Sequence, residues 1–213
     1  MFIVIDGPNG AGKTTLINNL GEKGYTTLSS PNGTPLAKML RPACRGAEPW
    51  VDIDKQIQFL LFSGARLDEY IRCVHGKKET VIADRWWTST YVYQCILQGI
   101  SVDFMEYTKH PDEVIDLVII LTGDSDALID RVEAERSKNP DHGKCTWTKE
   151  RDTMIRLGEI YVNELPAYLK CHGIMFNVVD TTNRTQEDVQ EEVEAIIKRK
   201  ESIVVKPYVS PTK

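Results

Sequence analysis

A glycine-rich segment near the start of the chain constrains the fold more than any other feature. Residues 2–5 are apolar and Asp6 follows them. The next eight residues, Gly7 to Thr14, match the pattern Gly-x-x-x-x-Gly-Lys-[Ser/Thr]. In such a loop the backbone N–H groups cradle phosphate oxygens, the lysine neutralises charge, and the hydroxyl after it can hold Mg²⁺. The residues predicted to bind phosphate or its metal are Gly7, Asn9, Gly10, Ala11, Gly12, Lys13, Thr14 and Thr15.

The alternative interpretation of this segment is a glycine-rich turn that binds nothing. The four fixed positions match by chance in roughly one chain of this length in a hundred. Here an apolar run of strand length precedes the loop and a stretch with helical spacing follows it. The sequence therefore predicts a nucleotide site, at which Thr14 can hold Mg²⁺.

Composition restricts the class of protein. A chain of 213 residues fits one α/β domain, and no apolar run is long enough to cross a membrane. A net charge of −5 argues against a general nucleic-acid surface. The five cysteines are scattered and odd in number, which is typical of reduced thiols in a cytoplasmic protein without a cysteine metal site.

Apolar runs alternate with longer amphipathic stretches, as in a doubly wound parallel sheet of five strands flanked by helices. A domain over 1–199 is expected, with an insertion at about 136–148 and a tail at 200–213, where 203–205 could add a strand. The predicted strands are 2–6, 24–29, 79–84, 116–122 and 174–179. The predicted helices are 13–22, 34–41, 53–75, 87–99, 101–109, 125–136, 149–171 and 185–199.

Ligands of such sheets bind beyond the carboxyl ends of the strands, and Asp84-Arg85 ends the third predicted strand. A carboxylate there can hold Mg²⁺, and the arginine can bind phosphate through two N–H groups. The alternative is an ion pair at the strand end. Because a phosphate loop is already present, we favour the functional interpretation.

Phe62 and Arg66 are four residues apart and share a face of a predicted helix. The ring can stack on a flat base while the guanidinium bonds to the edge of that base. The alternative is that Phe62 belongs to the core, since Leu60 and Leu61 occupy the same helix. Spacing alone favours the core interpretation.

Residues 136–151 form a basic, poorly periodic stretch between two predicted helices. Loops of this length are often lids, and cations on a lid can meet the charge that develops on a transferring phosphoryl group. Arg136 and Lys144 are the predicted catalytic cations of this lid. A solvated charged loop is the alternative.

Taken together, these residues resemble the thymidylate kinase family, whose members transfer a phosphoryl group from ATP to a deoxynucleoside monophosphate. The similarity extends from residue 2 to about 199. Its most specific parts are Leu-Leu-Phe-Ser-Gly-Ala-Arg at 60–66 and Asp-Arg-x-x-x-Ser-Thr-x-x-Tyr-Gln at 84–94. The resemblance reverses the interpretation of Phe62, which it implies stacks on the acceptor base.

The resemblance also implies roles for the other residues. Arg66 would bond to the base edge, Arg85 would hold the acceptor phosphate, and Tyr93 would lie beneath the sugar. Arg131 and the loop at Asp180 would flank the donor adenine. The implied acceptor residues are Asn9, Arg41, Phe62, Arg66, Arg85, Ser89, Thr90, Tyr93 and Gln94, with Thr14 and Asp84 at the metal. Family members are commonly homodimers, so a homodimer is expected.

Three positions depart from the family. Asn9 stands where the family has an acidic residue facing the 3′-hydroxyl of the acceptor, and Gly10 stands where the eukaryotic branch has an arginine. Catalytic positive charge must then come from the lid, as in the bacterial branch. Trp86-Trp87 is unusual beside the acceptor site and keeps a modified pyrimidine open as the base.

The predicted function is phosphoryl transfer from ATP to a deoxynucleoside monophosphate, with dTMP as the expected acceptor and small nucleotides as the ligands. One alternative is a kinase of a deoxynucleoside or of a modified pyrimidine in a nucleotide or in DNA. Another is an ATP-binding module without kinase chemistry, against which Asp84, Arg85 and the basic lid argue.

Overall fold

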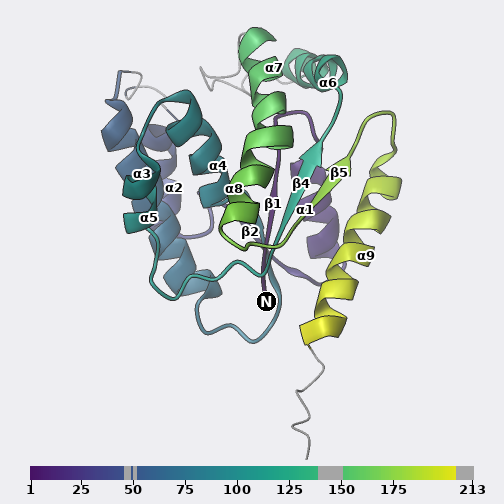
Figure 1. The fold of residues 1–213 in the computed structure, drawn as a ribbon, viewed down its shortest axis with the longest axis horizontal. Helices are drawn as coiled ribbons and strands as arrows, with labels where there is room; N and C mark the ends of the chain where they lie inside the picture. Colours follow the sequence, from purple (N-terminus) through teal and green to yellow (C-terminus); the bar gives the residue numbers. More distant parts are fainter. Residues whose placement is uncertain (46–48, 50–51, 139–150, 205–213) are drawn as a thin grey trace, which may run out of the picture.

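The structure is a computed structural model that describes residues 1–45, 49, 52–138 and 151–204. Its framework is a sheet of five parallel strands in the order β2-β3-β1-β4-β5, which confirms the predicted doubly wound architecture (Figure 1). The strands are β1 (Phe2–Asp6), β2 (Thr26–Ser29), β3 (Val81–Asp84), β4 (Leu117–Thr122) and β5 (Phe176–Asp180).

Helices cover both faces of this sheet (Figure 1). Three of the predicted helical stretches contain wider, π-helical segments, in which hydrogen bonds span five residues. The α-helices are α1 (Lys13–Glu22), α2 (Pro35–Cys44), α3 (Lys55–Glu69), α4 (Trp87–Thr90), α5 (Val102–Tyr107), α6 (Ser125–Lys138), α7 (Arg151–Glu159), α8 (Leu165–Cys171) and α9 (Gln186–Val204). The π-helical segments are η1 (Tyr70–Val74) after α3, η2 (Tyr91–Leu97) after α4, and η4 (Ile160–Glu164) between α7 and α8.

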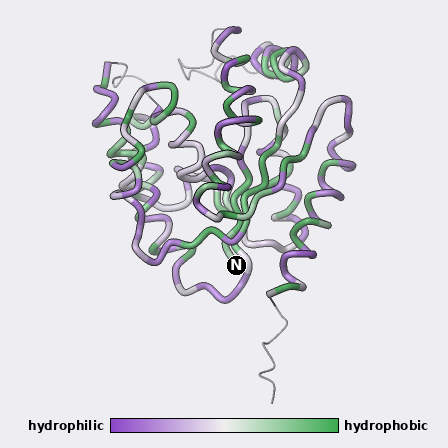
Figure 2. The backbone as a smooth tube through the Cα atoms, in the orientation of Figure 1, coloured by the Kyte–Doolittle hydropathy of each residue, from purple (hydrophilic) through white to green (hydrophobic). Residues whose placement is uncertain are grey.

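Two hydrophobic cores lie on opposite faces of the sheet because side chains alternate along β1. Phe2 and Val4 belong to the larger core, with residues of α3, η2, η4 and α8. Ile3 and Ile5 belong to the smaller core, which α1 and α9 cover. The tube in Figure 2 shows the result as hydrophobic strands surrounded by more hydrophilic helices.

Several predicted boundaries differ from the structure, and three helices end later than predicted. The helix expected to end at 41 continues as α2 through Cys44. The helix expected to end at 136 continues as α6 through Lys138, and the tail expected from 200 is still helical, since α9 ends at Val204. Glu201 accepts a hydrogen bond from Thr80 Oγ1, which ties the last turns of α9 to the start of β3. Ile203 is therefore helical, and no strand forms there within the described residues. Lys144 and residues 205–213 lie outside the described ranges.

The strand order brings two of the predicted functional segments together. In the parallel register Ile5 of β1 pairs with Asp84 of β3, so the phosphate loop and Arg85 leave the sheet side by side. The chain crosses from β1 to β2 and β3 on one side and to β4 and β5 on the other. This reversal of strand order opens a crevice at the carboxyl edge, where ligands of such sheets bind.

Candidate functional site

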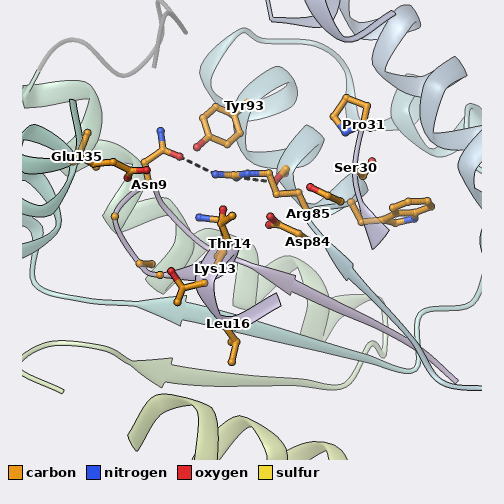
Figure 3. A pocket seen from close by; sticks show the side chains of 18 of the residues that line it. Asn9, Lys13, Thr14, Leu16, Ser30, Pro31, Asp84, Arg85, Tyr93 and Glu135 are labelled. Atoms are coloured by element: carbon orange, nitrogen blue, oxygen red, sulfur yellow. Dashed lines mark hydrogen bonds between the residues drawn. The ribbon is translucent and has the colours of Figure 1, made fainter. Parts of the chain in front are cut away.

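A cavity of about 900 Å³ lies at the carboxyl edge of the sheet. Residues predicted from separate parts of the sequence line it together, and Figure 3 shows how they converge around the end of β1. The predicted residues in its wall are Asn9, Gly10, Ala11, Gly12, Lys13, Thr14, Thr15, Arg41, Phe62, Arg66, Asp84, Arg85, Ser89, Thr90, Tyr93, Gln94, Arg131 and Arg136. Gly7 and Asp180 are not in the wall.

The phosphate loop needs its glycines for steric reasons. Gly7 has φ 148°, and a Cβ there would lie 2.2 Å from the carbonyl oxygen of Leu121. Gly12 has φ 83° immediately before α1, a left-handed conformation that other residues rarely adopt. Gly7 thus lets the loop pass close to β4, and Gly12 turns the chain into the helix.

Lys13 begins α1 and is almost fully buried. Its ammonium donates a hydrogen bond of 2.7 Å to the carbonyl oxygen of Pro8, across the phosphate loop. Burial, followed by the nearby charge of Arg85, lowers the pKa of Lys13 to about 7, against the opposing effect of Asp84 and Asp6. Burial therefore disfavours the charged form of Lys13 in the free protein, and a bound polyphosphate would stabilise that form.

Arg85 links the phosphate loop to the segment that follows β3. Its Nη2 donates to Oδ1 of Asn9 at 2.8 Å, as the dashed line in Figure 3 shows, and its Nη1 lies 3.1 Å from Ser89 Oγ. Its guanidinium also faces the Tyr93 ring, 5.6 Å from the centroid. The backbone of Arg85 has φ 66°, a left-handed conformation that places this side chain at the cavity.

Sequence reasoning missed the residue that holds Arg85 and Ser89 in place. Asp6, the last residue of β1, is completely buried and accepts hydrogen bonds from the backbone N–H of Gly7 and from three hydroxyl groups. These belong to Thr88, to Ser89 at 2.8 Å and to Tyr161 at 2.8 Å. Arg85 Nη1 lies 3.5 Å from the same carboxylate. The position of Asp6 at a strand end was a usable signal, whereas Tyr161 is 155 residues away and gave none.

Asp84 has the features of a metal ligand. It ends β3, is 7% exposed and lines the cavity, and no described residue bonds its Oδ1. Burial raises the pKa of this carboxyl, although Arg85 and Lys13 oppose the effect. An unpartnered buried carboxylate oxygen fits a hard cation such as Mg²⁺. The described residues contain no group of three or more His, Cys, Asp or Glu suited to a metal, so the other ligands would be phosphate oxygens, Thr14 and water.

The far end of the cavity fits a flat base. Phe62 of α3 is half-buried, lines the cavity and lies outside the core clusters, so the core interpretation that spacing favoured is wrong. Arg66, one turn along the same helix, is 7% exposed and donates to Thr90 Oγ1 at 2.7 Å and to Ser63 Oγ at 3.3 Å. Burial lowers the pKa of Arg66. These two hydroxyl groups orient a guanidinium that retains further N–H donors for a ligand.

The opposite end of the cavity is held by Arg131 of α6. Its two terminal nitrogens donate to Oγ1 and to the carbonyl oxygen of Thr181, at 3.1 and 2.8 Å. Thr181 lines the cavity, whereas the neighbouring Asp180 accepts bonds from Thr182 within its own turn. Those bonds lower the pKa of Asp180. The loop is therefore where the sequence predicted, but Thr181 is the residue that faces the cavity.

The two tryptophans that were unusual by sequence are explained by packing. Both are 2% exposed. Trp86 packs edge-to-face on Phe2, with ring centroids 5.0 Å apart, and its Nε1 donates to Glu113 at 2.6 Å. The ammonium of Lys109 lies 3.5 Å from the centre of the Trp87 ring. Packing in the core accounts for the size of both rings, and Trp86 also lines the cavity.

Comparison with known proteins gives a consistent result. Residues 5–193 match the thymidylate kinase family. A probable thymidylate kinase of Methanococcus aeolicus is 28% identical over 200 residues, which cover 90% of this chain and 93% of the relative. The thymidylate kinase of Bacillus pumilus is 27% identical over 212 residues, covering 92% and 94%.

Solved structures show the same fold. The thymidylate kinase of Ehrlichia chaffeensis matches 92% of this chain and 98% of its own, with a TM-score of 0.64 and 22% identity. That of Candida albicans matches 94% of this chain and 92% of its own, with a TM-score of 0.68 and 18% identity.

Proposed function

Because the chain belongs to the thymidylate kinase family, it is an enzyme that transfers a phosphoryl group from ATP to dTMP, and we propose that the cavity at the carboxyl edge of the sheet is its active site. One observation carries this proposal. A single cavity is lined by the phosphate loop on one side and by Phe62, Arg66 and Arg85 on the other. Donor and acceptor phosphates bound there would meet between Lys13 and Arg85.

The donor occupies the side of the cavity formed by the phosphate loop and α6. The N–H groups of the loop and the ammonium of Lys13 bind the β- and γ-phosphates, so that Lys13 exchanges the Pro8 carbonyl for phosphate oxygens. Arg131, fixed by Thr181, lies against the adenine. The loop thus holds the reacting phosphate while α6 holds the base.

Thr14 and Asp84 would hold Mg²⁺. Both line the cavity, and Asp84 Oδ1 has no partner among the described residues. Held there, the ion would neutralise charge on the donor phosphates. Burial raises the pKa of Asp84 in the free protein, and a bound cation would favour its ionised form.

The acceptor occupies the side formed by α3 and the segment after β3. Phe62 stacks on the thymine, Arg66 donates to its carbonyl edge, and Tyr93 lies beside the sugar. Arg85 and Arg41 bind the acceptor phosphate. The remaining polar residues of this side are Asn9, Ser89, Thr90 and Gln94.

Catalysis results mainly from positioning and charge, because phosphoryl transfer leaves little covalent work to a protein. Lys13 and Arg85 hold the two reacting phosphates in line. Arg136 lies in the cavity wall, next to the predicted lid, and supplies positive charge from there. Lys144 is proposed for the same role on sequence grounds alone. These cations oppose the charge that spreads over the transferring oxygens.

We also propose that the enzyme is a cytoplasmic homodimer. Ile57 and Leu60 of α3 and Ile71 of η1 are about half exposed and fall on one helix face, and Met39 of α2 is exposed as well. An apolar stripe of this kind favours burial against a second copy. The described cysteines are free thiols, as in a reducing compartment. No helix in the described ranges has the length and apolar character that a bilayer span requires.

The function is tested by an acceptor screen. Purified protein with ATP and Mg²⁺ is given each deoxynucleoside monophosphate, including 5-substituted pyrimidines, and ADP release is measured. We expect dTMP to give the highest kcat/KM and EDTA to abolish turnover. ADP release that no acceptor stimulates would overturn the proposal and favour a non-catalytic ATP-binding module. A higher kcat/KM for a 5-substituted pyrimidine would replace dTMP as the substrate.

A further inference from the structure

Glu69, the last residue of α3, is a buried carboxylate that the mechanism above does not use. It has no exposed surface, and no described lysine or arginine lies within ion-pair distance of it. Burying a charge without a counter-ion is costly unless hydrogen bonds replace water. Glu69 accepts three: from Ser30 Oγ at 2.6 Å and from the backbone N–H groups of Asn32 and Gly33 at 2.8 and 2.6 Å.

All three donors belong to the segment that joins β2 to α2. This segment also reaches the cavity, because Ser30 and Pro31 lie in its wall (Figure 3). Arg41, one of the two arginines assigned to the acceptor phosphate, donates to the carbonyl oxygen of Pro31 at 3.0 Å. A displacement of the segment would therefore move Arg41.

The segment is fitted closely to α3. A Cβ at Gly33 would lie 2.0 Å from a methyl group of Leu28 and 3.2 Å from Oε1 of Glu69. The backbone N–H of Ser30 in turn donates to the carbonyl oxygen of Asp84 at 3.1 Å. Glu69 and Asp84 thus hold the segment from two sides.

Glu69 lies on the same helix as the two residues assigned to the base. Phe62, Arg66 and Glu69 are spaced i, i+4 and i+7, which places them along one face of α3. The carboxylate of Glu69 also acts electrostatically on both Arg66 and Arg41. One rigid element therefore bears the base contacts and the anchor of the phosphate segment.

We propose that Glu69 is a positioning residue for the acceptor nucleotide. By fixing the segment Ser29–Gly33 to α3, it sets the distance between the base site at Phe62 and Arg66 and the phosphate site at Arg41. The inference rests on the acceptor site proposed above. It adds that loss of Glu69 weakens the binding of dTMP and leaves the binding of ATP unchanged.

The experiment compares Glu69→Ala and Glu69→Gln with the parent enzyme and measures kcat, KM for dTMP and KM for ATP. In Glu69→Ala three hydrogen bonds are lost, so KM for dTMP should rise by about tenfold or more while KM for ATP stays within about twofold. Glu69→Gln keeps an oxygen for the two backbone N–H groups and should recover most of the loss. Ser30→Ala removes one of the three bonds and should raise KM for dTMP only a few-fold.

Glu194→Ala is the matched control. Glu194 of α9 is also a buried carboxylate, and it accepts from Lys23, Gln190 and Lys198 on the opposite face of the sheet. Its loss should lower the melting temperature as Glu69→Ala does, without changing the ratio of the two KM values. This control separates a positioning role from general destabilisation.

Equal changes of the two KM values in Glu69→Ala, or no change in either, would overturn the inference. If Glu69→Ala does not fold, Glu69→Gln and Ser30→Ala test the inference through smaller increases of KM for dTMP. An unchanged KM for dTMP in both would then count against it. Failure of the proposed function is distinct, since it would be seen in the parent enzyme as an absence of dTMP phosphorylation.

Discussion

The guanidinium of Arg85 donates a hydrogen bond of 2.8 Å from Nη2 to the side-chain oxygen of Asn9. This bond joins the end of β3 to the phosphate loop, so the residue assigned to the acceptor phosphate is oriented by the loop that binds the donor. Asn9 serves as a neutral acceptor here. Its role can be tested by measuring KM for dTMP while ATP is saturating.

Asn9→Ala should raise KM for dTMP by about five- to tenfold, because the guanidinium of Arg85 loses its hydrogen bond to the neutral Asn9 oxygen, worth about 1–1.5 kcal/mol. Asn9→Asp keeps an acceptor oxygen and should retain a KM close to that of the parent. Steady-state kinetics at saturating ATP measure both. A parental KM in Asn9→Ala would show that Arg85 holds its position without the loop.

Lys13→Ala should lower turnover by several orders of magnitude without unfolding the protein, because the donor phosphates lose their buried cation. The substitution should also remove a pH dependence from the stability of the folded protein. The pKa of Lys13 is about 7 in the fold against an ordinary 10.5, so the folded state binds fewer protons between these values and its stability rises with pH there. Urea unfolding of the parent at pH 7 and 9 should show this rise, and Lys13→Ala should lack it.

Binding of ATP should take up protons at pH 8. Lys13 in the free protein is mostly neutral at that pH, and bound phosphates raise its pKa again. Calorimetric titration in buffers of different ionisation enthalpy measures the uptake, which should approach one proton. Lys13→Arg stays protonated throughout and should show far less. Equal uptake in both proteins would contradict the assignment to Lys13.

Tyr161→Phe should destabilise the protein by about 1 kcal/mol, since Asp6 loses one of its buried hydrogen-bond donors. It should also raise KM for dTMP a few-fold, because Arg85 and Ser89 share the same carboxylate. Chemical unfolding and kinetics give the two values. Tyr107, which is 89% exposed, provides the control: Tyr107→Phe should change neither.

Leu60→Glu should convert a dimer into monomers, because it places a charge in the apolar stripe formed with Ile57 and Ile71. Light scattering coupled to size exclusion measures the mass. Val162→Glu is the control, since Val162 is equally exposed on η4. A parent enzyme that is already monomeric at micromolar concentration would contradict the proposal of a homodimer.

Local signals predicted the part of the molecule around the donor phosphates well. The boundaries of β1 and α1 agree with the sequence, because a short apolar run, a glycine-rich turn and a regular helix each depend on neighbouring residues. The end of α9 was misplaced by five residues, since Thr80, which lies just before β3 and far away in the sequence, supports that turn. A pattern within one segment cannot show such a contact.

The acceptor side was predictable only as a set of residue types. The sequence placed Phe62 and Arg66 on one helix face but could not show whether that face turned to the core or to a cavity. Asp6 with Tyr161, and Glu69 with Ser30, are pairs separated by 155 and 39 residues. Their partners are set by tertiary packing, and neither pair follows a periodic pattern.

Arg85 combines a functional side chain with a backbone that few residues other than glycine adopt, at φ 66°. Such a conformation costs on the order of 1 kcal/mol, and the fold bears this cost whether or not substrate is present. Arg85→Gly would relieve the backbone, but it would also remove the hydrogen bonds to Asn9 and Ser89 and the charge that faces the buried carboxylate of Asp6, so we expect it to lower the melting temperature. At this position selection for heat resistance and selection for turnover should therefore retain the same residue, because one side chain serves both the fold and the acceptor phosphate.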